Sequence, residues 1–412
     1  MTSPLDRPRR VLRHGAYRRL WLAAVVSRAG DTLNFVALPL FVYAVTRSAA
    51  AVGALVIVEI AGAITGALLA NPFVDRSPPR SVLIGADGVR LVAAAALAVA
   101  PSPATAYIAA FVLAVATAVF SPTSAALVPR LVPADDLQTA NGLQWTAGVI
   151  LQLVIAPLGG LLVASASIRV PFAINAASFA ASALILTGVP HHAALAIDRS
   201  GLRQLPDAVR AFGRSRLLPP LLAMQALAAL AVGATSALLV VLAQQGYGLS
   251  ATGYGLWLGA IGLGALIGPL LLAALRGIAA GTVVTGAYAI RGAGDILLAL
   301  LPSAAAAAGV LAIYGVNTSS GMVAFQTMVQ RGTAAELRGR AFALLDAVWQ
   351  AGRLLSIAAG AFAVAAFGIR ALYVAGGALL LLAAAVGAFR LRGQPAPSVA
   401  TAAAAPGMTR GA

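Results

Sequence analysis

Ionised residues inside long apolar stretches are the part of this sequence most able to do chemistry. Asp31 lies in an apolar run at 19-45, three positions after Arg28, and Ser27 and Asn34 continue the same helical face. A charge in the middle of a bilayer costs at least about 2.5 kcal/mol, so a carboxylate here requires a partner or a function. At 1.5 Å per residue it lies about 18 Å along a helix of about 40 Å, which makes Asp31 a proton-coupling candidate near the midplane.

Glu59 is the second proton-coupling candidate. It lies in an apolar run at 50-73 and has no charged neighbour within one helical turn. A carboxyl group in a low-dielectric site favours its neutral, protonated form. Glu59 is therefore expected either to carry a proton or to pack as a neutral, hydrogen-bonded side chain.

Other ionised residues are spaced to neutralise one another on one helical face. Asp87 and Arg90 are three positions apart, and Arg291 and Asp295 are four apart, spacings at which side chains of a helix meet. We expect these four residues to form structural pairs inside the membrane. Arg28 with Asp31, and Asp346 with Arg353, are aligned in the same way.

Mixed aromatic and amide faces on several apolar runs indicate a binding cavity. Such surfaces suit an amphipathic organic ligand, although the same side chains can instead hydrogen-bond between helices. The cavity candidates are Arg28, Asn34, Gln144, Trp145, Gln152, Tyr314, Asn317, Trp349, Gln350 and Arg353.

The elements that must position these residues are membrane helices. Of the 412 residues, 60% are hydrophobic and only 10% are charged, which excludes an ordinary soluble domain. A helical crossing needs about 20 apolar residues, and twelve runs qualify. They lie at 19-45, 50-73, 82-100, 104-122, 139-165, 170-188, 217-243, 252-275, 281-301, 304-327, 340-366 and 369-389.

The positive charge gives the orientation. All 28 basic residues are Arg, and the net charge is +16. When Arg residues at the ends of runs are counted with the adjoining polar segment, one side of the membrane, including both tails, has 21 Arg and the other side has three. The Arg-rich side and both termini are therefore expected in the cytoplasm, beside anionic lipid. This distribution argues against a nucleic-acid partner. Without Cys or Lys, the chain also lacks thiolate metal sites and the phosphate-binding Gly-Lys-Ser/Thr loop, and we expect no cofactor, metal or catalytic residues.

The chain divides into two similar halves. The longest gap, 189-216, separates six runs from six, and residues recur at an offset near 200, as in Arg90 with Arg291 and Arg169 with Arg370. This pattern predicts a duplicated six-helix unit with a site between the copies. We expect a cytoplasmic segment at 1-18, bundles at 19-188 and 217-389, and a disordered tail at 390-412. The 189-216 linker reads as an amphipathic surface helix or, alternatively, as a solvated basic segment.

Two strings resemble a known family. The segment NPFVDRSPPR, residues 71-80, resembles the loop between the second and third helices of the major facilitator superfamily, with matches at Asp75, Arg76 and Arg80. The string SPTSAALVPRLVPADDLQTANGL, residues 121-143, resembles the branch that holds the enterobactin exporter and the macrolide-efflux permeases. The resemblance implies that Asp75, Arg76 and Arg80 form a cytoplasmic gate, for which Arg338 and Arg340 supply nearby positive charge.

The resemblance also implies an architecture and a function. The fold is expected to be all-α, with twelve membrane helices in two pseudo-symmetric six-helix bundles. The function is expected to be proton-coupled efflux of a drug-like, macrolide-like or siderophore-like small molecule by a monomer in the inner cell membrane. Export rests mainly on the branch resemblance. The alternatives are an uptake permease for a small organic nutrient and a non-transporting receptor; an enzyme is not expected.

Overall fold

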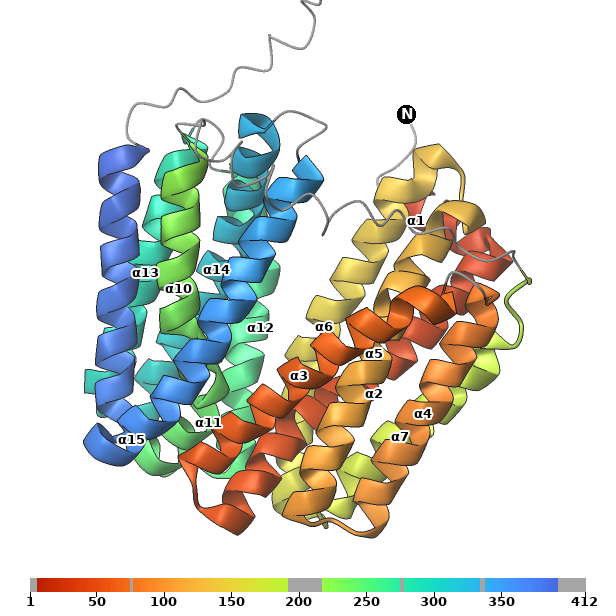
Figure 1. Cartoon of the computed structure of the whole chain (residues 1–412), viewed down its shortest axis with the longest axis horizontal. Coiled ribbons are helices and arrows are strands. Elements are labelled where there is room, and N and C mark those ends of the chain that lie inside the picture. Colours follow the sequence, from red (N-terminus) through yellow and green to blue (C-terminus); the bar gives the residue numbers. More distant parts are fainter. Residues whose placement is uncertain (1–5, 75–76, 192–216, 275–277, 334–337, 392–412) are drawn as a thin grey trace, which may run out of the picture.

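A computed structural model describes residues 6–74, 77–191, 217–274, 278–333 and 338–391. Throughout these ranges the regular elements are helices (Figure 1). In a bilayer each backbone N–H and C=O must be paired within the protein, and a helix does this within its own segment. The long apolar runs therefore fold into membrane-length helices.

The first half contains six long helices. Several of them begin with a residue suited to a helix start, as at Ser102, whose side chain accepts a hydrogen bond from the Thr105 backbone. The elements are α1 (Asp6–Arg13), α2 (Gly15–Thr46), α3 (Ala49–Val74), α4 (Pro79–Val99), α5 (Pro103–Leu131), η1 (Ala134–Asp136), α6 (Leu137–Ser165) and α7 (Arg169–Leu186).

The second half contains five long helices, of which the last makes two crossings. Gly368, with φ 80° and ψ 164°, breaks α15 where a residue with a Cβ would be strained. The elements are α10 (Leu218–Ala237), α11 (Leu239–Val241), η2 (Leu242–Gly246), α12 (Ala251–Ala274), α13 (Ala280–Leu300), α14 (Ala304–Gly332) and α15 (Arg338–Arg390). In the described ranges eleven helices are long and apolar enough to cross a membrane. Counting α15 twice gives the twelve expected crossings.

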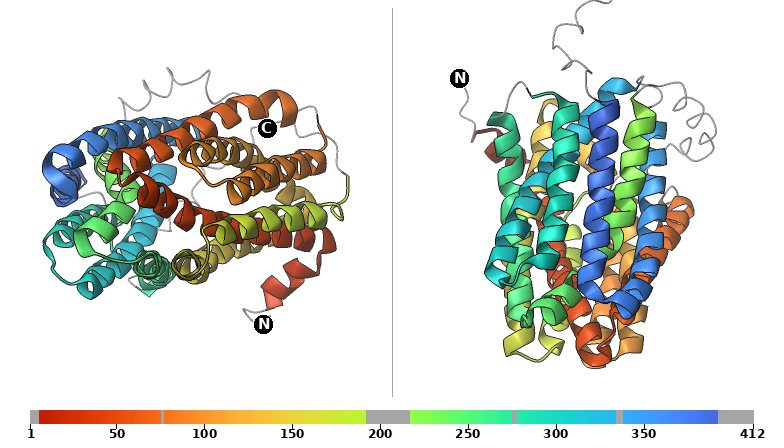
Figure 2. Two further views of the ribbon diagram at one scale, coloured as in Figure 1. Left: turned by 90° about the horizontal axis from the view of Figure 1, so that it is seen from below. Right: turned by 90° about the vertical axis from the view of Figure 1, so that its left-hand side faces the viewer.

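Each half repeats the same helix pairing, and the two bundles lie side by side (Figures 1 and 2). In the first half α3 packs on α5 and α4 on α7; in the second, α12 packs on α14 and α13 on α15. Gly66 of α3 meets the backbone of Val115, and Gly268 of α12 meets that of Val316, at contacts that leave no room for a Cβ. Small residues permit such close approach of membrane helices.

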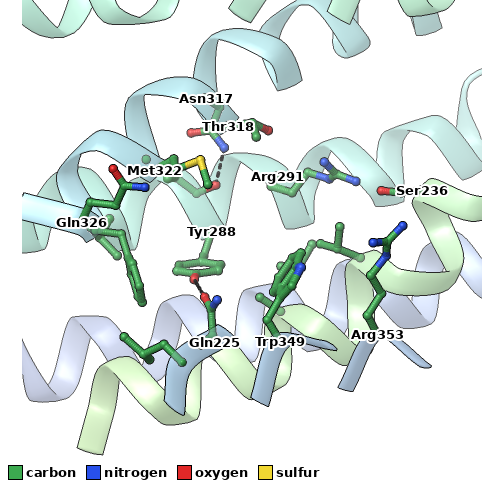
Figure 3. Close-up of a pocket in the computed structure, with 18 of the residues that line it drawn as sticks. Gln225, Ser236, Tyr288, Arg291, Asn317, Thr318, Met322, Gln326, Trp349 and Arg353 are labelled. Carbon is green, nitrogen blue, oxygen red and sulfur yellow. Dashed lines mark hydrogen bonds between the residues drawn. The ribbon is translucent and has the colours of Figure 1, made fainter. Parts of the chain in front are cut away.

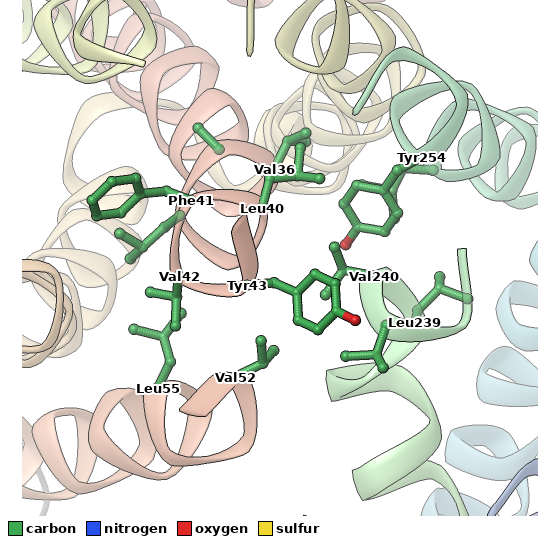
Figure 4. Packing of buried hydrophobic residues seen from close by; sticks show 14 of the residues in the cluster. Val36, Leu40, Phe41, Val42, Tyr43, Val52, Leu55, Leu239, Val240 and Tyr254 are labelled. Carbon is green, nitrogen blue, oxygen red and sulfur yellow. The ribbon is translucent and has the colours of Figure 1, made fainter. Parts of the chain in front are cut away.

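Among the described residues, the main apolar cluster that includes both halves lies near one end. There, α2 and α3 of the first half contact α11 and α12 of the second (Figure 4). At the other end, which carries α1, each half has its own separate apolar cluster. The halves therefore join at the end opposite α1 and diverge towards the α1 end (Figure 1). We call the joining residues the shared cluster; they include Val36, Leu40, Tyr43, Val52, Leu55, Leu239, Val240 and Tyr254.

Candidate functional site

Among the described residues, candidate site residues gather at two cavities, one in each half. The N-half chamber has a volume of about 220 Å³ and lies between α2, α4, α5 and α6. Its lining consists of Ala24, Ser27, Arg28, Asp31, Arg90, Thr117, Phe120, Ser121, Ser124, Ala125, Val128, Asn141 and Gln144.

The C-half chamber is larger, about 600 Å³, and lies between α10, α13, α14 and α15 (Figure 3). Five aromatic rings and a set of amide, hydroxyl and charged groups line it. The lining consists of Gln225, Ala228, Val232, Ser236, Val284, Ala287, Tyr288, Arg291, Tyr314, Asn317, Thr318, Gly321, Met322, Phe325, Gln326, Phe342, Leu345, Asp346, Trp349, Arg353 and Leu380.

Arg90 is the centre of the N-half chamber. Its guanidinium contacts the Asp87 carboxylate, and its Nη1 lies 3.5 Å from Asp31 Oδ2. Arg90 and Asp87 are almost wholly buried, whereas about a third of the Asp31 side chain is exposed. The guanidinium also lies 4.2 Å from the ring centre of Phe120 and 4.6 Å from that of Phe179. The Asp87–Arg90 pair thus forms, and Asp31 joins it from another helix.

Arg28 does not form the contact with Asp31 that its spacing in the sequence predicts. Instead of an ion pair with Asp31, its Nη1 donates a hydrogen bond of 3.1 Å to the backbone carbonyl of Gln144. Both residues line the N-half chamber. The contact ties α2 to α6 beside the carboxylate of Asp31, which keeps a positive charge near that group.

Three first-half cavity candidates, Asn34, Trp145 and Gln152, lie outside the lining of both chambers. The Asn34 Oδ1 atom is buried without a hydrogen-bond partner. Trp145 is 49% exposed, and the backbone of Gln152 lies against Gly262, where α6 meets α12.

Arg291 is held in the wall of the C-half chamber. Its Nε lies 3.1 Å from Asp295 Oδ1, so the expected pair forms, and its guanidinium stacks 3.1 Å from the ring centre of Tyr314. Beside it, Asn317 Nδ2 donates a 2.5 Å hydrogen bond to the Ala287 carbonyl. Arg291 is thus neutralised within its own helix, and Asn317 joins α14 to α13 while also lining the chamber.

Tyr314, Asn317, Trp349 and Arg353 all lie on the C-half chamber. Gln350 does not line it, and its Oε1 atom is buried without a hydrogen-bond partner. Tyr288, which was not predicted from the sequence, also lines the chamber, and its hydroxyl lies 3.5 Å from Gln225 Oε1. The repeat itself was the available signal, because Tyr288 stands one repeat after Asp87.

Glu59 has a charged neighbour across the interface between the halves. It lies on α3, which packs on α15, and it interacts electrostatically with Arg353. The apolar contact of Val56 and Ile60 with Ile357 surrounds this pair. Glu59 thus belongs to the interface rather than to either chamber.

An ion pair at the α1 end lies outside the chambers and was not predicted. Arg10 of α1 contacts the Asp136 carboxylate, and His14 Nε2 lies 3.7 Å from it. The hydrogen bond from Arg10 holds the pKa of Asp136 below its usual value. The contact fastens α1 to the start of α6.

The expected gate falls largely outside the described residues. Asp75 and Arg76 are not described, and neither are the side chains of Arg338 and Arg340, although their backbones form the first turn of α15. Arg80 lies in the first turn of α4. Residues 192–216, which hold most of the expected linker, and 392–412, in the expected tail, are also outside the described ranges.

Solved structures of several transporters share this fold. The nucleoside transporter NupG superposes with a TM-score of 0.73 at 12% identity, covering 92% of this chain and 100% of its own. A bacterial homologue of the human lysosomal transporter Spinster, described as inward-facing and unoccupied, gives 0.70 at 16%, covering 97% and 100%. A bacterial homologue of the iron transporter ferroportin, described as inward-facing, gives 0.71 at 18%, covering 94% and 99%. At these identities the likeness concerns the fold alone.

The sequence comparison gives the family. No curated protein matches the chain, but the profile of the Major Facilitator Superfamily matches residues 20–356. That range includes most of both bundles and the residues of both chambers except Leu380. The chain therefore belongs to the major facilitator superfamily, and it is a multi-pass membrane transporter of small molecules rather than an enzyme.

Proposed function

We propose that this protein is a proton-coupled exporter of an amphipathic drug-like, macrolide-like or siderophore-like molecule. The observation that carries the proposal is the cluster in the N-half chamber, where Asp31 and Asp87 share the single guanidinium of Arg90. With both carboxylates ionised these three residues have one negative charge in excess, which Arg28 on the same chamber wall offsets without forming an ion pair, and a proton on Asp31 removes it. Intramembrane charges of this kind mark proton and ion pathways.

Asp31 is the member that exchanges the proton. Asp87 is wholly buried against Arg90, whereas Asp31 is partly exposed on the chamber wall and lies farther from the guanidinium. A proton on Asp31 weakens its attraction to Arg90 and so loosens the contact between α2 and α4. A ligand or proton that favours one conformation shifts the transporter towards it.

We place the protein in the inner cell membrane, with the α1 end in the cytoplasm, because most of the Arg residues between the membrane segments lie on that side. The described conformation is then closed outwards by the shared cluster and opens inwards. Two fold relatives are described as inward-facing, which supports this assignment. We propose that a single chain performs the cycle, since each half supplies one chamber.

The test is transport by the purified protein in proteoliposomes. A panel of antibiotics and siderophores is screened by counterflow, and an active compound is then driven by an imposed pH gradient. We expect uphill movement of the compound against the proton flow. Asp31→Asn is expected to slow gradient-driven transport at least about tenfold, a change of 1.4 kcal/mol in the barrier, while gradient-independent counterflow persists. Asp135→Asn, at an exposed acid on η1, is the control.

Two results would contradict the proposal. Full gradient-driven transport by Asp31→Asn would remove this residue from the coupling step. Movement of the compound in the same direction as the protons would make the protein an uptake permease instead of an exporter.

A further inference from the structure

The two chambers occupy equivalent places in the repeat. When 201 is added to the residue numbers of the 13 residues that line the N-half chamber, 11 of the resulting positions line the C-half chamber. Arg90 corresponds to Arg291 and Thr117 to Thr318. The chambers thus occupy corresponding positions in the two halves, and their linings can be compared residue by residue.

Several corresponding side chains are polar in the N-half chamber and apolar in the C-half chamber, although Ala24 and Ala125 correspond to Gln225 and Gln326. Asp31 corresponds to Val232, so the second copy lacks the carboxylate that joins the Arg90 pair in the first. The polar residues Ser124 and Asn141 correspond to Phe325 and Phe342. The cavity has also grown from about 220 to about 600 Å³. One copy is a small polar chamber suited to a proton, and the other is a large aromatic chamber suited to an organic molecule.

In the C-half chamber, Arg291 corresponds to Arg90, but its acidic partner stands at a different position in the helix. The position equivalent to Asp87 is Tyr288, and the partner of Arg291 is now Asp295, one turn further along α13. Because Asp295 is 1% exposed, the pair stays inside the wall, and the Tyr288 ring faces the chamber in its place (Figure 3).

Among the described residues, one charged group on the chamber wall forms no ion pair. Arg291 is paired with Asp295, and the charge of Arg353 is opposed by Glu59. Asp346 is exposed on the lining, and within the described residues it forms no ion pair. The faces of nearby aromatic rings, including Trp349, add attraction for a cation. The unbalanced charge of the chamber is therefore negative.

We propose that the C-half chamber is the substrate site and that it takes a lipophilic organic cation, with Asp346 as its counter-ion and the aromatic rings around its apolar part. This inference rests on the proposed export function, since it names the substrate class of that transporter. It separates basic, drug-like molecules from anionic siderophores, which would meet the Asp346 carboxylate unfavourably.

The test is binding rather than transport. Equilibrium dialysis measures the affinity of the protein in lipid nanodiscs for tetraphenylphosphonium and for tetraphenylborate, ions of the same shape and opposite charge. Both ions also partition into lipid, so the uptake by empty nanodiscs is subtracted, and the remaining binding is expected to be tighter for the cation than for the anion. We expect Asp346→Asn to weaken binding of the cation about tenfold and binding of the anion not at all, and Phe342→Ala to weaken both. Asp135→Asn is the matched control, since it removes an acid outside both chambers.

Tighter binding of the anion, or unchanged cation affinity in Asp346→Asn with a normal unfolding temperature, would overturn the proposal. If Asp346→Asn does not fold, the comparison of the two ions on the unmodified protein still decides it. The two proposals also fail separately. Specific cation binding without gradient-driven transport would reject proton coupling and keep the substrate class. Gradient-driven transport without cation binding would reject the substrate class and keep proton coupling.

Discussion

Gly160 of α6 and Gly255 of α12 lie back to back where the two halves meet. A Cβ added to Gly160 would lie 2.9 Å from the Gly255 Cα, and one added to Gly255 would lie 3.0 Å from the Gly160 Cα. We therefore expect Gly160→Leu to force the halves apart at the end opposite α1 and to slow transport. Because the chain contains no Cys, a single Val36→Cys substitution reports this opening through its rate of thiol labelling.

Val36 is wholly buried in the shared cluster, so labelling is expected to be slow in the parent protein and at least about tenfold faster beside Gly160→Leu, a change of 1.4 kcal/mol in the opening equilibrium. Gly142→Leu is the control on the same helix, because a Cβ at Gly142 would have no neighbour within 4 Å. Equal labelling in the two glycine variants would show that the contact does not hold the halves together at the end opposite α1.

Glu59 and Arg353 provide a test of electrostatic contact between the halves. Neutralising either residue leaves the other without its counter-charge in a low-dielectric interface, so Glu59→Gln and Arg353→Gln are each expected to lower the unfolding temperature. The loss of unfolding free energy in the double variant should be smaller than the sum of the losses in the two single variants, by a coupling energy of about 0.5–3 kcal/mol. Tryptophan fluorescence during heating in detergent measures it. Strict additivity would mean that the two charges do not stabilise one another.

The Arg10–Asp136 contact is expected to make the attachment of α1 dependent on pH. The pKa of Asp136 is lowered in the folded protein, so the contact stabilises the fold above the unfolded value of about 3.9, and this contribution disappears as the pH falls through the folded value. The difference in unfolding temperature between the parent and Asp136→Asn should therefore be clear at pH 7 and vanish in acid. Asp135→Asn, its exposed neighbour, should show no such difference.

Asn317 is expected to stabilise the second half through one hydrogen bond. Its Nδ2 donates to the Ala287 carbonyl, and interhelical hydrogen bonds in membranes contribute about 0.6 kcal/mol on average. Asn317→Ala should lower stability by about that amount in thermal unfolding. Thr318→Val, a change of one polar side chain at the next position, is the control. An Asn317→Ala variant as stable as the parent would leave Asn317 as a lining residue only.

Contacts within one helix and the helices themselves were predictable from the sequence. The apolar runs predicted the membrane crossings, because each membrane segment must pair its own backbone N–H and C=O groups and does so as a helix. The last two runs separate at Gly368, where the helix breaks. The pairs Asp87–Arg90 and Arg291–Asp295 followed from the helical period. The break after α10 was missed, because residues 238–243 contain neither Pro nor Gly.

Contacts between helices were not predictable in the same way. Arg90 reaches Asp31 on another helix, and Arg353 faces Glu59 in the other half. Such contacts depend on how each helix is rotated and tilted against its neighbours, and nearly uniform apolar composition leaves no marked polar face to reveal this. The charge spacing therefore favoured Arg28 as the partner of Asp31, whereas packing of α2 on α6 turns Arg28 towards Gln144.

The shared cluster also determines how well the resting protein insulates the membrane. Its valine and leucine side chains are almost wholly buried between the halves, and an apolar constriction of this kind stays dry and blocks ions. Wetting each such side chain costs about 1.5–3 kcal/mol, so separation of the halves at this end is costly for the empty protein. Under the proposed function, cargo or a proton offsets that cost, which would couple each opening at this end to a loaded carrier and prevent a leak of the gradient.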